Sequence, residues 1–273
     1  MFRVVATDLD GTLLRSDIQI DPLTVSTLRE IEAMGVELVL ATARHPLDAA
    51  HFRDILQVRA HLVSLNGARV HDPQGAPLLV ENLDPAVARA LMSREVAGER
   101  LLLVSSEAGW LLSRPHPRLE AYCRSAGFGA EVRDLGSHDG EGVATVMYWG
   151  EPDEIVRAEA EIAGRFAGEL RTVLTTDRCF DIMAPSVSKG RALTEILRRL
   201  GVPSRDCVAF GDGQNDIDML SAAGQPFLMS GSSPGLVAAF PGAKVAGSND
   251  EAGVARALRG LFGLPEGPGP LNP

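Results

Sequence analysis

The chain has 273 residues, of which 45% are hydrophobic and 23% are charged, a composition typical of folded globular proteins. Its 36 acidic residues outnumber its 26 lysines and arginines, which gives a formal net charge of -10 without any block of basic residues. This balance argues against nucleic acid as a partner, and it means that a phosphate site must attract its ligand through local groups such as a metal, a lysine or helix N-termini.

The cysteines and the N-terminal residues bear on the cellular compartment in which the protein is expected. Cys123, Cys179 and Cys207 are widely spaced and form neither a C-x-x-C motif nor a paired disulfide framework, so we expect buried, reduced thiols. The N-terminal apolar run is too short for a signal peptide, and no stretch approaches the ~20 apolar residues of a membrane span. We therefore expect a cytoplasmic protein without a membrane partner.

The N-terminal part of the chain has the pattern of a βαβ unit. A strand is predicted at Val4–Thr7, a helix from Pro22 to Gly35 with Asp21 as its cap, and a second strand at Val36–Leu40. A unit of this kind predicts a parallel sheet with a right-handed crossover.

The pattern continues with a helix and a hairpin. The helix is predicted at Asp48–Leu56 and the next strand at His61–Leu65. The pair Asn66-Gly67 suits a tight type I′ turn, so Ala68–Val70 is predicted to return as the second strand of the hairpin.

In residues 84–184 the order of predicted elements no longer alternates between strand and helix. Short turns between predicted strands indicate antiparallel pairing with helices over one face, and this predicts an α+β insert that forms a small domain of its own. Its predicted helices are Pro85–Val96, Pro117–Ala126 and Pro152–Phe166, and its predicted strands are Leu101–Ser105, Trp110–Leu112, Val143–Tyr148, Leu170–Thr175 and Arg178–Met183.

The alternating pattern resumes after Pro185, so residues 1–83 and 185–273 are predicted to form one core that the insert divides. The fold class is therefore α/β, a doubly wound, Rossmann-like parallel sheet with an inserted α+β cap. The Pro- and Gly-rich tail at Gly263–Pro273 is predicted to be flexible. The remaining predicted helices are Lys189–Leu200, Asp216–Ala223 and Asp250–Leu261, and the remaining strands are Cys207–Phe210 and Pro226–Met229.

Two carboxylates follow the first strand. Asp8 and Asp10 lie two positions apart, so an extended backbone directs both toward the same side. Gly11 adds backbone freedom and Thr12 a hydroxyl group, and the run D-L-D-G-T suits a turn around Mg²⁺ and a phosphoryl group. Taken alone, the run is equally compatible with an acidic surface turn.

Further polar residues stand at predicted strand ends and helix starts. Each has an ordinary explanation as a helix cap, a solvated charge or a turn residue. Their coincidence at one edge of one sheet is less ordinary, because ligands of such sheets bind where the strands end. The residues are Thr42, Lys189, Asp212, Asn215 and Asp216.

With these motifs the sequence resembles the haloacid dehalogenase superfamily, in particular its Cof-type, sugar-phosphatase-like branch with a type IIB cap. D-x-D-G-T at Asp8–Thr12 and G-D-x-x-N-D at Gly211–Asp216 are the specific motifs, with Thr42 and Lys189 between them. The insert is similar to the type IIB cap in position and element order. The resemblance spans almost the whole core through three more segments, at Asn66–Ala68, Val187–Gly190 and Asn215–Leu220.

The resemblance implies an enzyme that hydrolyses a small-molecule phosphate ester with Mg²⁺ as cofactor. It makes Asp8 the nucleophile that forms an aspartyl-phosphate intermediate, and Asp10 the general acid and then base. It makes Thr42 and Lys189 catalytic as well. The implied metal ligands are Asp8, Asp10 (through its carbonyl oxygen), Asp212 and Asp216, and the implied phosphate-binding residues are Gly11, Thr42, Ala43, Arg44, Lys189 and Asn215.

Some residues depart from the family pattern, and the roles of some others are left undecided by the sequence. Ala43 stands where the family usually has glycine, and Met229–Ser233 replaces a more usual G-N-A run. The six histidines lack metal-ligand spacing and are expected on the surface or in loops, although Arg44 and His45 either face the substrate or serve as a salt bridge and a helix cap. Trp110, Tyr148 and Trp149 are expected to pack within the cap, with the substrate face as the alternative. The sequence does not indicate an oligomeric state.

Two other functions remain open. A phosphomutase of the phosphomannomutase type shares the two aspartates and the cap, but it returns the phosphoryl group to a sugar. A receiver-like switch places similar residues around Mg²⁺, although Asp10 and the long insert argue against it. For a phosphatase, sugar phosphates are the leading substrate class, followed by phosphorylated cofactors such as pyridoxal phosphate or flavin mononucleotide.

Overall fold

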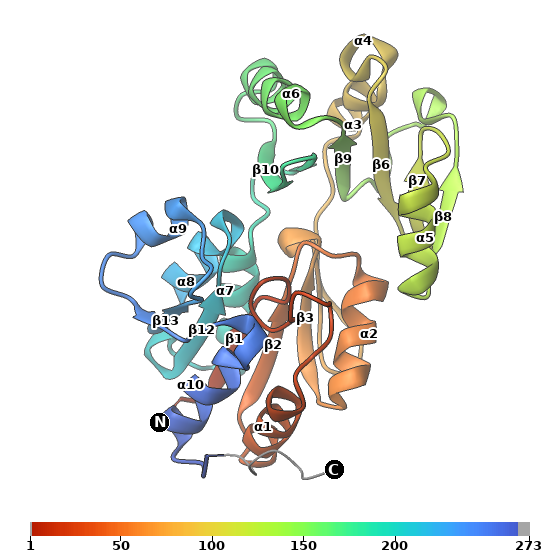
Figure 1. Ribbon diagram of the computed structural model, residues 1–273. Coiled ribbons are helices and arrows are strands. Elements are labelled where there is room, and N and C mark those ends of the chain that lie inside the picture. Colours follow the sequence, from red (N-terminus) through yellow and green to blue (C-terminus); the bar gives the residue numbers. More distant parts are fainter. Residues whose placement is uncertain (1, 267–273) are drawn as a thin grey trace.

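The computed structural model describes residues 2–266 and contains two β-sheets, one at each end of the molecule in Figure 1. The larger sheet has eight strands, whose order is β14 (Lys244–Val245), β13 (Gln225–Leu228), β12 (Cys207–Gly211), β1 (Val4–Thr7), β2 (Glu37–Ala41), β3 (Ala60–Ser64), β4 (Arg69–His71) and β5 (Pro77–Val80).

Strand β1 lies in the middle of this sheet and is parallel to both of its neighbours. Ala6 lies opposite Val39 of β2 and Ala209 of β12. The chain proceeds from β1 to β3 on one side and from β12 to β14 on the other, and all of these strands are parallel. At one edge β4 runs in the opposite direction, antiparallel to both β3 and β5. The loops that follow β1, β2 and β12 therefore meet at one edge of the sheet, where ligands of such folds bind.

Helices cover both faces of the larger sheet, because its strands are apolar on both sides. Val5 and Leu38 pack in the same cluster as Leu28 of α1, whereas Val4 and Val39 pack with helices of the opposite face. This arrangement confirms the predicted doubly wound fold. The first face carries α1 (Pro22–Ala33), α2 (Pro46–Leu56) and α10 (Gly253–Phe262), and the second carries α7 (Lys189–Leu200), α8 (Ile217–Ala222) and α9 (Pro234–Ala239).

The smaller sheet has helices over one face. We call the elements from α3 to β11 the cap and the rest of the chain the core. The strand order is β10 (Arg171–Thr176), β11 (Cys179–Met183), β9 (Thr145–Trp149), β6 (Leu101–Ser106), β7 (Gly109–Leu112) and β8 (Gly129–Val132). The covering helices are α3 (Pro85–Met92), α4 (Arg94–Ala97) and α6 (Pro152–Arg165), while α5 (Pro117–Ser125) packs beside β8.

The elements of the cap all lie between residues 85 and 183, within the range predicted for the insert. The boundaries 1–83, 84–184 and 185–273, and the independence of the cap as a domain, stay predictions. Three short strands, β5, β8 and β14, were not predicted. Strand β8 pairs with β7 in parallel, because α5 connects the end of β7 with the beginning of β8.

Two local predictions were wrong. The helix predicted at Pro85–Val96 is broken at Ser93, whose extended backbone (φ -67°, ψ 149°) ends α3 while its hydroxyl group caps α4. The hairpin after β3 has a longer turn than a two-residue type I′ turn, because Ser64 pairs with Arg69 and four residues connect them. Leu65 and Asn66 both have positive φ there, at 49° and 55°.

Four further predictions concern the cap of α1, the cysteines, membrane spans and the C-terminal tail. Asp21 caps α1 by accepting a hydrogen bond from the backbone N–H of Leu23 at 2.8 Å, as predicted. All three cysteines are buried free thiols. None of the helices within residues 2–266 is long and apolar enough to span a membrane. From residue 267 on, the tail predicted to be flexible lies outside the described residues.

Candidate active site

The turn after β1 packs directly against the turn after β12. The backbone N–H of Asp8 donates to the carbonyl oxygen of Phe210 at 3.0 Å, and the hydroxyl group of Thr12 donates to Oδ1 of Asp212 at 3.1 Å. Gly11 has a φ of 72°, and a Cβ atom there would lie 2.4 Å from Oδ2 of Asp212. Glycine accommodates both the positive φ and this close approach, which explains the glycine of the D-x-D-G-T motif.

Three carboxylates gather at this edge of the sheet. Asp8, Asp212 and Asp216 each offer an oxygen atom, and these atoms lie within 4.8 Å of one another. Asp216 is held by the backbone N–H groups of Asp212 and Gly213, which donate to its Oδ2 at 3.0 and 2.9 Å. Asp8 is only 5% exposed.

The crowding of these carboxylates disfavours their charged forms. Burial raises the pKa of Asp8 well above its usual value; Lys189 opposes this effect, and the carboxylates of Asp216, Asp212 and Asp10 add to it. Burial and then Asp216 raise the pKa of Asp212 to about 6. A cation among these oxygen atoms would relieve the repulsion, and carboxylate oxygens are the ligands that hard divalent cations prefer. The donor set therefore fits a divalent metal ion.

Lys189 is the cation that the chain itself supplies. Its side chain is only 1% exposed, and its ammonium group donates to Oδ1 of Asp8 and to Oδ1 of Asp216, both at 2.7 Å. Burial alone would lower the pKa of Lys189, but Asp216 and Asp8 outweigh it and raise the pKa. Lys189 is in position because Ser188 caps α7 through its hydroxyl group, which accepts from the N–H of Arg191 at 3.1 Å.

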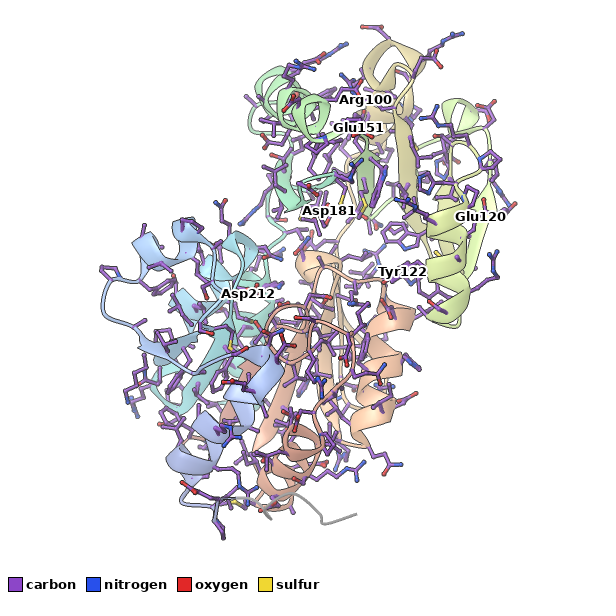
Figure 2. All side chains as sticks on the ribbon, viewed as in Figure 1. Arg100, Glu120, Tyr122, Glu151, Asp181 and Asp212 are labelled. Carbon is purple, nitrogen blue, oxygen red and sulfur yellow. The ribbon has the colours of Figure 1, made fainter. Side chains whose placement is uncertain are left out.

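Asp10 points away from the buried carboxylates and toward Arg44. The guanidinium binds both of its oxygens, with Nε to Oδ2 at 2.7 Å and Nη2 to Oδ1 at 2.6 Å. The same guanidinium binds Asp48 at 2.7 Å and the hydroxyl group of Tyr122 at 3.2 Å, and that hydroxyl group also donates to Asp48. Since Tyr122 belongs to α5, this network joins Asp10 to the cap. Figure 2 labels Tyr122 on the cap and Asp212 on the core.

Asn215 is part of a second link between core and cap. Its side-chain amide donates to Oδ1 of Asn66 at 3.0 Å, and the amide of Asn66 donates to Oδ2 of Asp181 in β11 at 2.9 Å. Asp181 also accepts from the hydroxyl group of Thr175 at 2.8 Å. The phosphate-binding candidate Asn215 is therefore coupled to a buried carboxyl group of the cap.

A cavity of about 760 Å³ lies between the strand ends of the core and the open face of the cap sheet. It brings together most of the predicted site residues. Thr42 is fully buried, its hydroxyl group accepts from the N–H of Arg44 at 3.1 Å, and it is not among the described residues that line the cavity. Lys189 is not a described lining residue either, but it contacts Asp8, which is one. The predicted residues that line the cavity are Asp8, Asp10, Gly11, Ala43, Arg44, Asp212 and Asn215.

The structure corrects the expectation for His61, which is buried in β3, whereas His45 adopts the role of a helix cap that the sequence left open for it. His45 caps α2, with Nδ1 accepting from the N–H of Leu47 at 3.3 Å, while Nε2 lies 2.8 Å from the carbonyl oxygen of Ser106 in the cap. One nitrogen must accept and the other donate, so the ring is neutral, which agrees with the lowered pKa that its burial causes.

Asp48 and Tyr122 were missed as site residues. Asp48 lies four residues after Arg44, a spacing that favours an ion pair on a helix start and could have been recognised. The role of Tyr122 depends on how the cap packs on the core, and the sequence around it carries no signal of that contact. Trp110 and Trp149 line the cavity, whereas Tyr148 is buried on the other side of the cap sheet, where its hydroxyl group donates to the carbonyl oxygen of Leu91.

We expect Asp181 to make the unfolding free energy depend on pH. Burial raises the pKa of Asp181 to about 6, although hydrogen bonds from Thr175 and Asn66 lower it. Because an unfolded aspartate has a pKa of ~3.9, the folded state binds the proton more tightly, and lowering the pH from 7 to 5 stabilises it by about 1 kcal/mol relative to Asp181→Asn. Urea unfolding at both pH values measures this difference, with Asp177→Asn as an exposed control. Parallel pH dependences of wild type and Asp181→Asn would contradict it.

Comparison with known proteins gives consistent matches over nearly the whole chain. The model of the haloacid dehalogenase-like hydrolase family matches residues 5–258. A protein of Haemophilus influenzae with the name "Putative phosphatase" is 35% identical over 266 residues, which are 96% of this chain and 98% of that protein. The HMP-PP phosphatase of Cronobacter sakazakii is 31% identical over 258 residues, which are 94% of this chain and 95% of that protein.

The solved structures include a subclass IIB sugar phosphatase of the same superfamily. It superimposes with a TM-score of 0.82 at 18% identity, and the match covers 96% of this chain and 99% of that one. At this level of identity the likeness concerns the fold, and it agrees with a parallel core sheet joined to a second, cap-like sheet.

Proposed function

Because the chain belongs to the haloacid dehalogenase-like hydrolases and is a phosphatase of this family, we propose that it is Mg²⁺-dependent and that Asp8 attacks the phosphorus atom of a small phosphorylated metabolite. The observation that supports this role is the placement of Asp8 at the cavity wall, with Lys189 bound to one of its oxygens. A nucleophilic carboxylate must be ionised and oriented, and the buried lysine serves both needs.

The reaction would proceed in two displacements. The bond between Asp8 and phosphorus forms while the bond from phosphorus to the leaving oxygen breaks, and Asp10 gives that oxygen its proton. Asp10 then takes a proton from a water molecule, whose oxygen attacks the phosphoryl group and regenerates Asp8. Lys189 and Asn215 would hold phosphoryl oxygens in both steps, and Lys189 offsets part of the local negative charge.

The metal would be held by Asp8, Asp212 and Asp216 together with the backbone carbonyl group of Asp10. Mg²⁺ would supply positive charge beside the phosphoryl oxygens, which lowers the repulsion between the anionic substrate and the carboxylates. The chain provides the oxygen ligands and keeps them close together through Thr12 and the backbone around Gly213.

We expect phosphate release to stop in EDTA and to return with excess Mg²⁺, because the carboxylates then regain the cation that offsets their charge. Phosphate release would be measured over a panel of sugar phosphates and phosphorylated cofactors, with HMP-PP included because a relative is named for it. Equal turnover in EDTA and Mg²⁺ would contradict metal dependence. Isomerisation of a sugar phosphate that needs a bisphosphate would instead identify a mutase.

Arg44 is proposed to position the general acid. Arg44→Lys keeps the charge, but an ammonium group cannot bind both oxygens of Asp10 and also Asp48 in the geometry of the guanidinium fork. We expect kcat to fall about 10- to 100-fold with a smaller change in KM, and we expect the acidic and basic limbs of the pH profile to shift. Arg53, which pairs with the exposed carboxyl group of Asp54, offers Arg53→Lys as the control. An unchanged pH profile would remove Arg44 from this role.

A further inference from the structure

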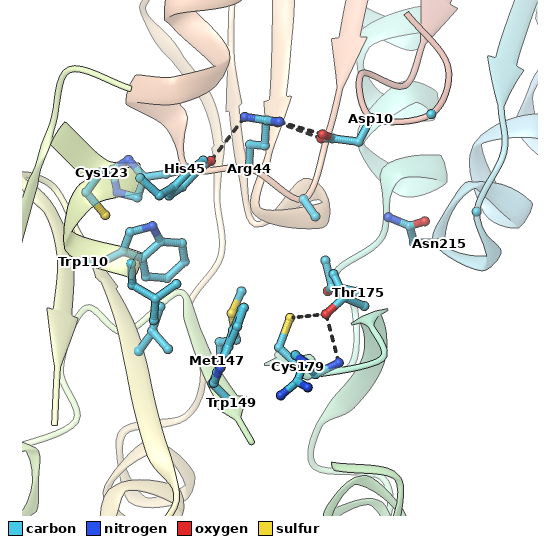
Figure 3. A pocket seen from close by; sticks show the side chains of 18 of the residues that line it. Asp10, Arg44, His45, Trp110, Cys123, Met147, Trp149, Thr175, Cys179 and Asn215 are labelled. Carbon is cyan, nitrogen blue, oxygen red and sulfur yellow. Dashed lines mark hydrogen bonds and ion pairs between the residues drawn. The ribbon is translucent and has the colours of Figure 1, made fainter. Parts of the chain in front are cut away.

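The cap sheet presents an apolar and aromatic surface to the cavity. Met147 of β9 lies opposite Leu103 of β6, and Trp149 of β9 lies opposite Cys179 of β11, so these side chains point to the same face of the sheet. We call them, together with Trp110 of β7, the aromatic platform; all five line the cavity. Figure 3 shows Trp110, Met147 and Trp149 on the side of the cavity opposite Asp10 and Arg44.

The hydroxyl groups of the cap around this platform already have hydrogen-bond partners. The cap residues described as lining the cavity include no Asp, Glu, Asn or Gln. The hydroxyl groups of Tyr122 and Thr175 donate to Asp48 and Asp181, and that of Thr176 accepts from a backbone N–H at 3.1 Å. A sugar needs donors and acceptors for several hydroxyl groups, and each hydroxyl buried without a partner is costly. The platform therefore suits a flat apolar group better than a polyol.

A free positive charge lies beside the platform. Arg118 and Arg178 both line the cavity, and with Trp149 they also line a smaller pocket at its rim. Arg178 binds Glu151 at 2.9 Å, whereas Arg118 has no ion pair or side-chain hydrogen bond to any residue between 2 and 266. The rim therefore adds a positive charge without an acidic partner in a chain that is negative overall.

Resting on the phosphatase reaction proposed above, we propose that the leaving group is a planar aromatic ring that carries a second negative charge. The ring would stack on the platform, where half-buried Trp149 still exposes part of its surface, and the second anion would meet Arg118. This assigns the specificity of the enzyme to a substrate class other than simple sugar phosphates.

Four phosphate esters of primary alcohols test the proposal, because their leaving groups have similar intrinsic reactivity. They are benzyl phosphate, para-carboxybenzyl phosphate, cyclohexylmethyl phosphate and a hexose phosphate esterified at its primary alcohol. We expect kcat/KM to be about 10-fold higher for the benzyl than for the cyclohexylmethyl ester. The carboxyl group should raise kcat/KM by a further ~3-fold, and the hexose phosphate should be the poorest substrate.

Variants test which side chain causes each of these ratios of kcat/KM. Trp149→Leu should abolish the preference for benzyl over cyclohexylmethyl, and Trp149→Phe should keep most of it. Arg118→Gln should abolish the advantage of the carboxyl group, while Arg114→Gln, an exposed neighbour outside the cavity lining, should not. Each ratio is measured within one preparation, so partial unfolding of a variant does not change it. Equal or inverted ratios in wild type would overturn the proposal.

Binding can be measured without turnover, since the only two tryptophans of the chain both belong to the platform. Phenylethylphosphonate and cyclohexylethylphosphonate replace the bridging oxygen by a methylene group and cannot be hydrolysed. We expect the phenyl compound to quench tryptophan fluorescence with a Kd about 10-fold lower. Equal affinities would overturn the aromatic assignment even if the enzyme hydrolyses phosphate esters. Conversely, a clear Kd preference without phosphate release from any ester would support the assignment and contradict only the proposed reaction.

Discussion

Asp8→Asn is expected to release phosphate at least ~10⁴-fold more slowly than wild type from every substrate. The carboxamide has nearly the shape of the carboxylate, but it is a poor nucleophile and cannot form the acyl phosphate. Lys189 keeps its contact with Asp216, so the remaining site is preserved. The loss would therefore report on chemistry, because the fold around position 8 has little reason to change.

The measurement is single-turnover phosphate release with Mg²⁺ and excess enzyme, which separates the chemical step from product release. Asp54→Asn, an exposed position on α2, is the control and should keep wild-type turnover. Urea unfolding of both variants shows whether they are folded. Residual phosphate release by a folded Asp8→Asn within 10-fold of wild type would show that another group is the nucleophile.

Lys189→Met is expected to lose about 3–5 kcal/mol of unfolding free energy at pH 7 in addition to activity. The substitution leaves the carboxylates of Asp8 and Asp216 buried without the cation that both contact at 2.7 Å. Because burial and its neighbours raise the pKa of Asp8, protonation becomes favourable as the pH falls, and the loss should shrink toward acidic pH. Saturating Mg²⁺ should restore part of the stability, because the ion binds only the folded state.

Urea unfolding at several pH values tests this expectation. The other lysine of the chain, Lys244, is exposed on β14, and Lys244→Met is the control that should change stability by well under 1 kcal/mol. A loss below 1 kcal/mol for Lys189→Met, or a loss that is the same at all pH values, would mean that the two carboxylates are already neutral in the folded protein.

The parts of the site that depend on local chain geometry could be predicted from the sequence. Asp8 and Asp212 each follow a buried apolar strand, and Lys189 opens a helix, so the rules for parallel sheets place all three at one edge. The same rules gave the doubly wound core and most elements of the cap. The tight packing of Gly11 on Asp212 then explains why the motif has glycine at this position.

The contacts between core and cap could not be predicted, because they join residues far apart in the sequence. Asn66 and Asp181 are 115 positions apart, and Arg44 and Tyr122 are 78 apart. The sequence left His45 open between facing the substrate and capping a helix, and its packing against cap residues such as Trp110, whose ring lies 5.5 Å away, could not be predicted. The break at Ser93 could not be predicted because the flanking residues keep a helical pattern. The boundary between α3 and α4 is set by tertiary packing and by the side chain of Ser93, which caps α4.

The role of Asp8 as a nucleophile can be tested most directly by trapping the phosphorylated enzyme. Asp10→Asn should accumulate it, because no base remains at position 10 to activate water. Trypsin would cut after Arg3 and Arg15 and leave Asp8 and Asp10 in one peptide. After an acid quench during turnover, mass spectrometry should find one phosphoryl group on Asp8 that hydroxylamine removes. Turnover without any phosphorylated peptide, or a phosphoryl group on another residue, would contradict the account.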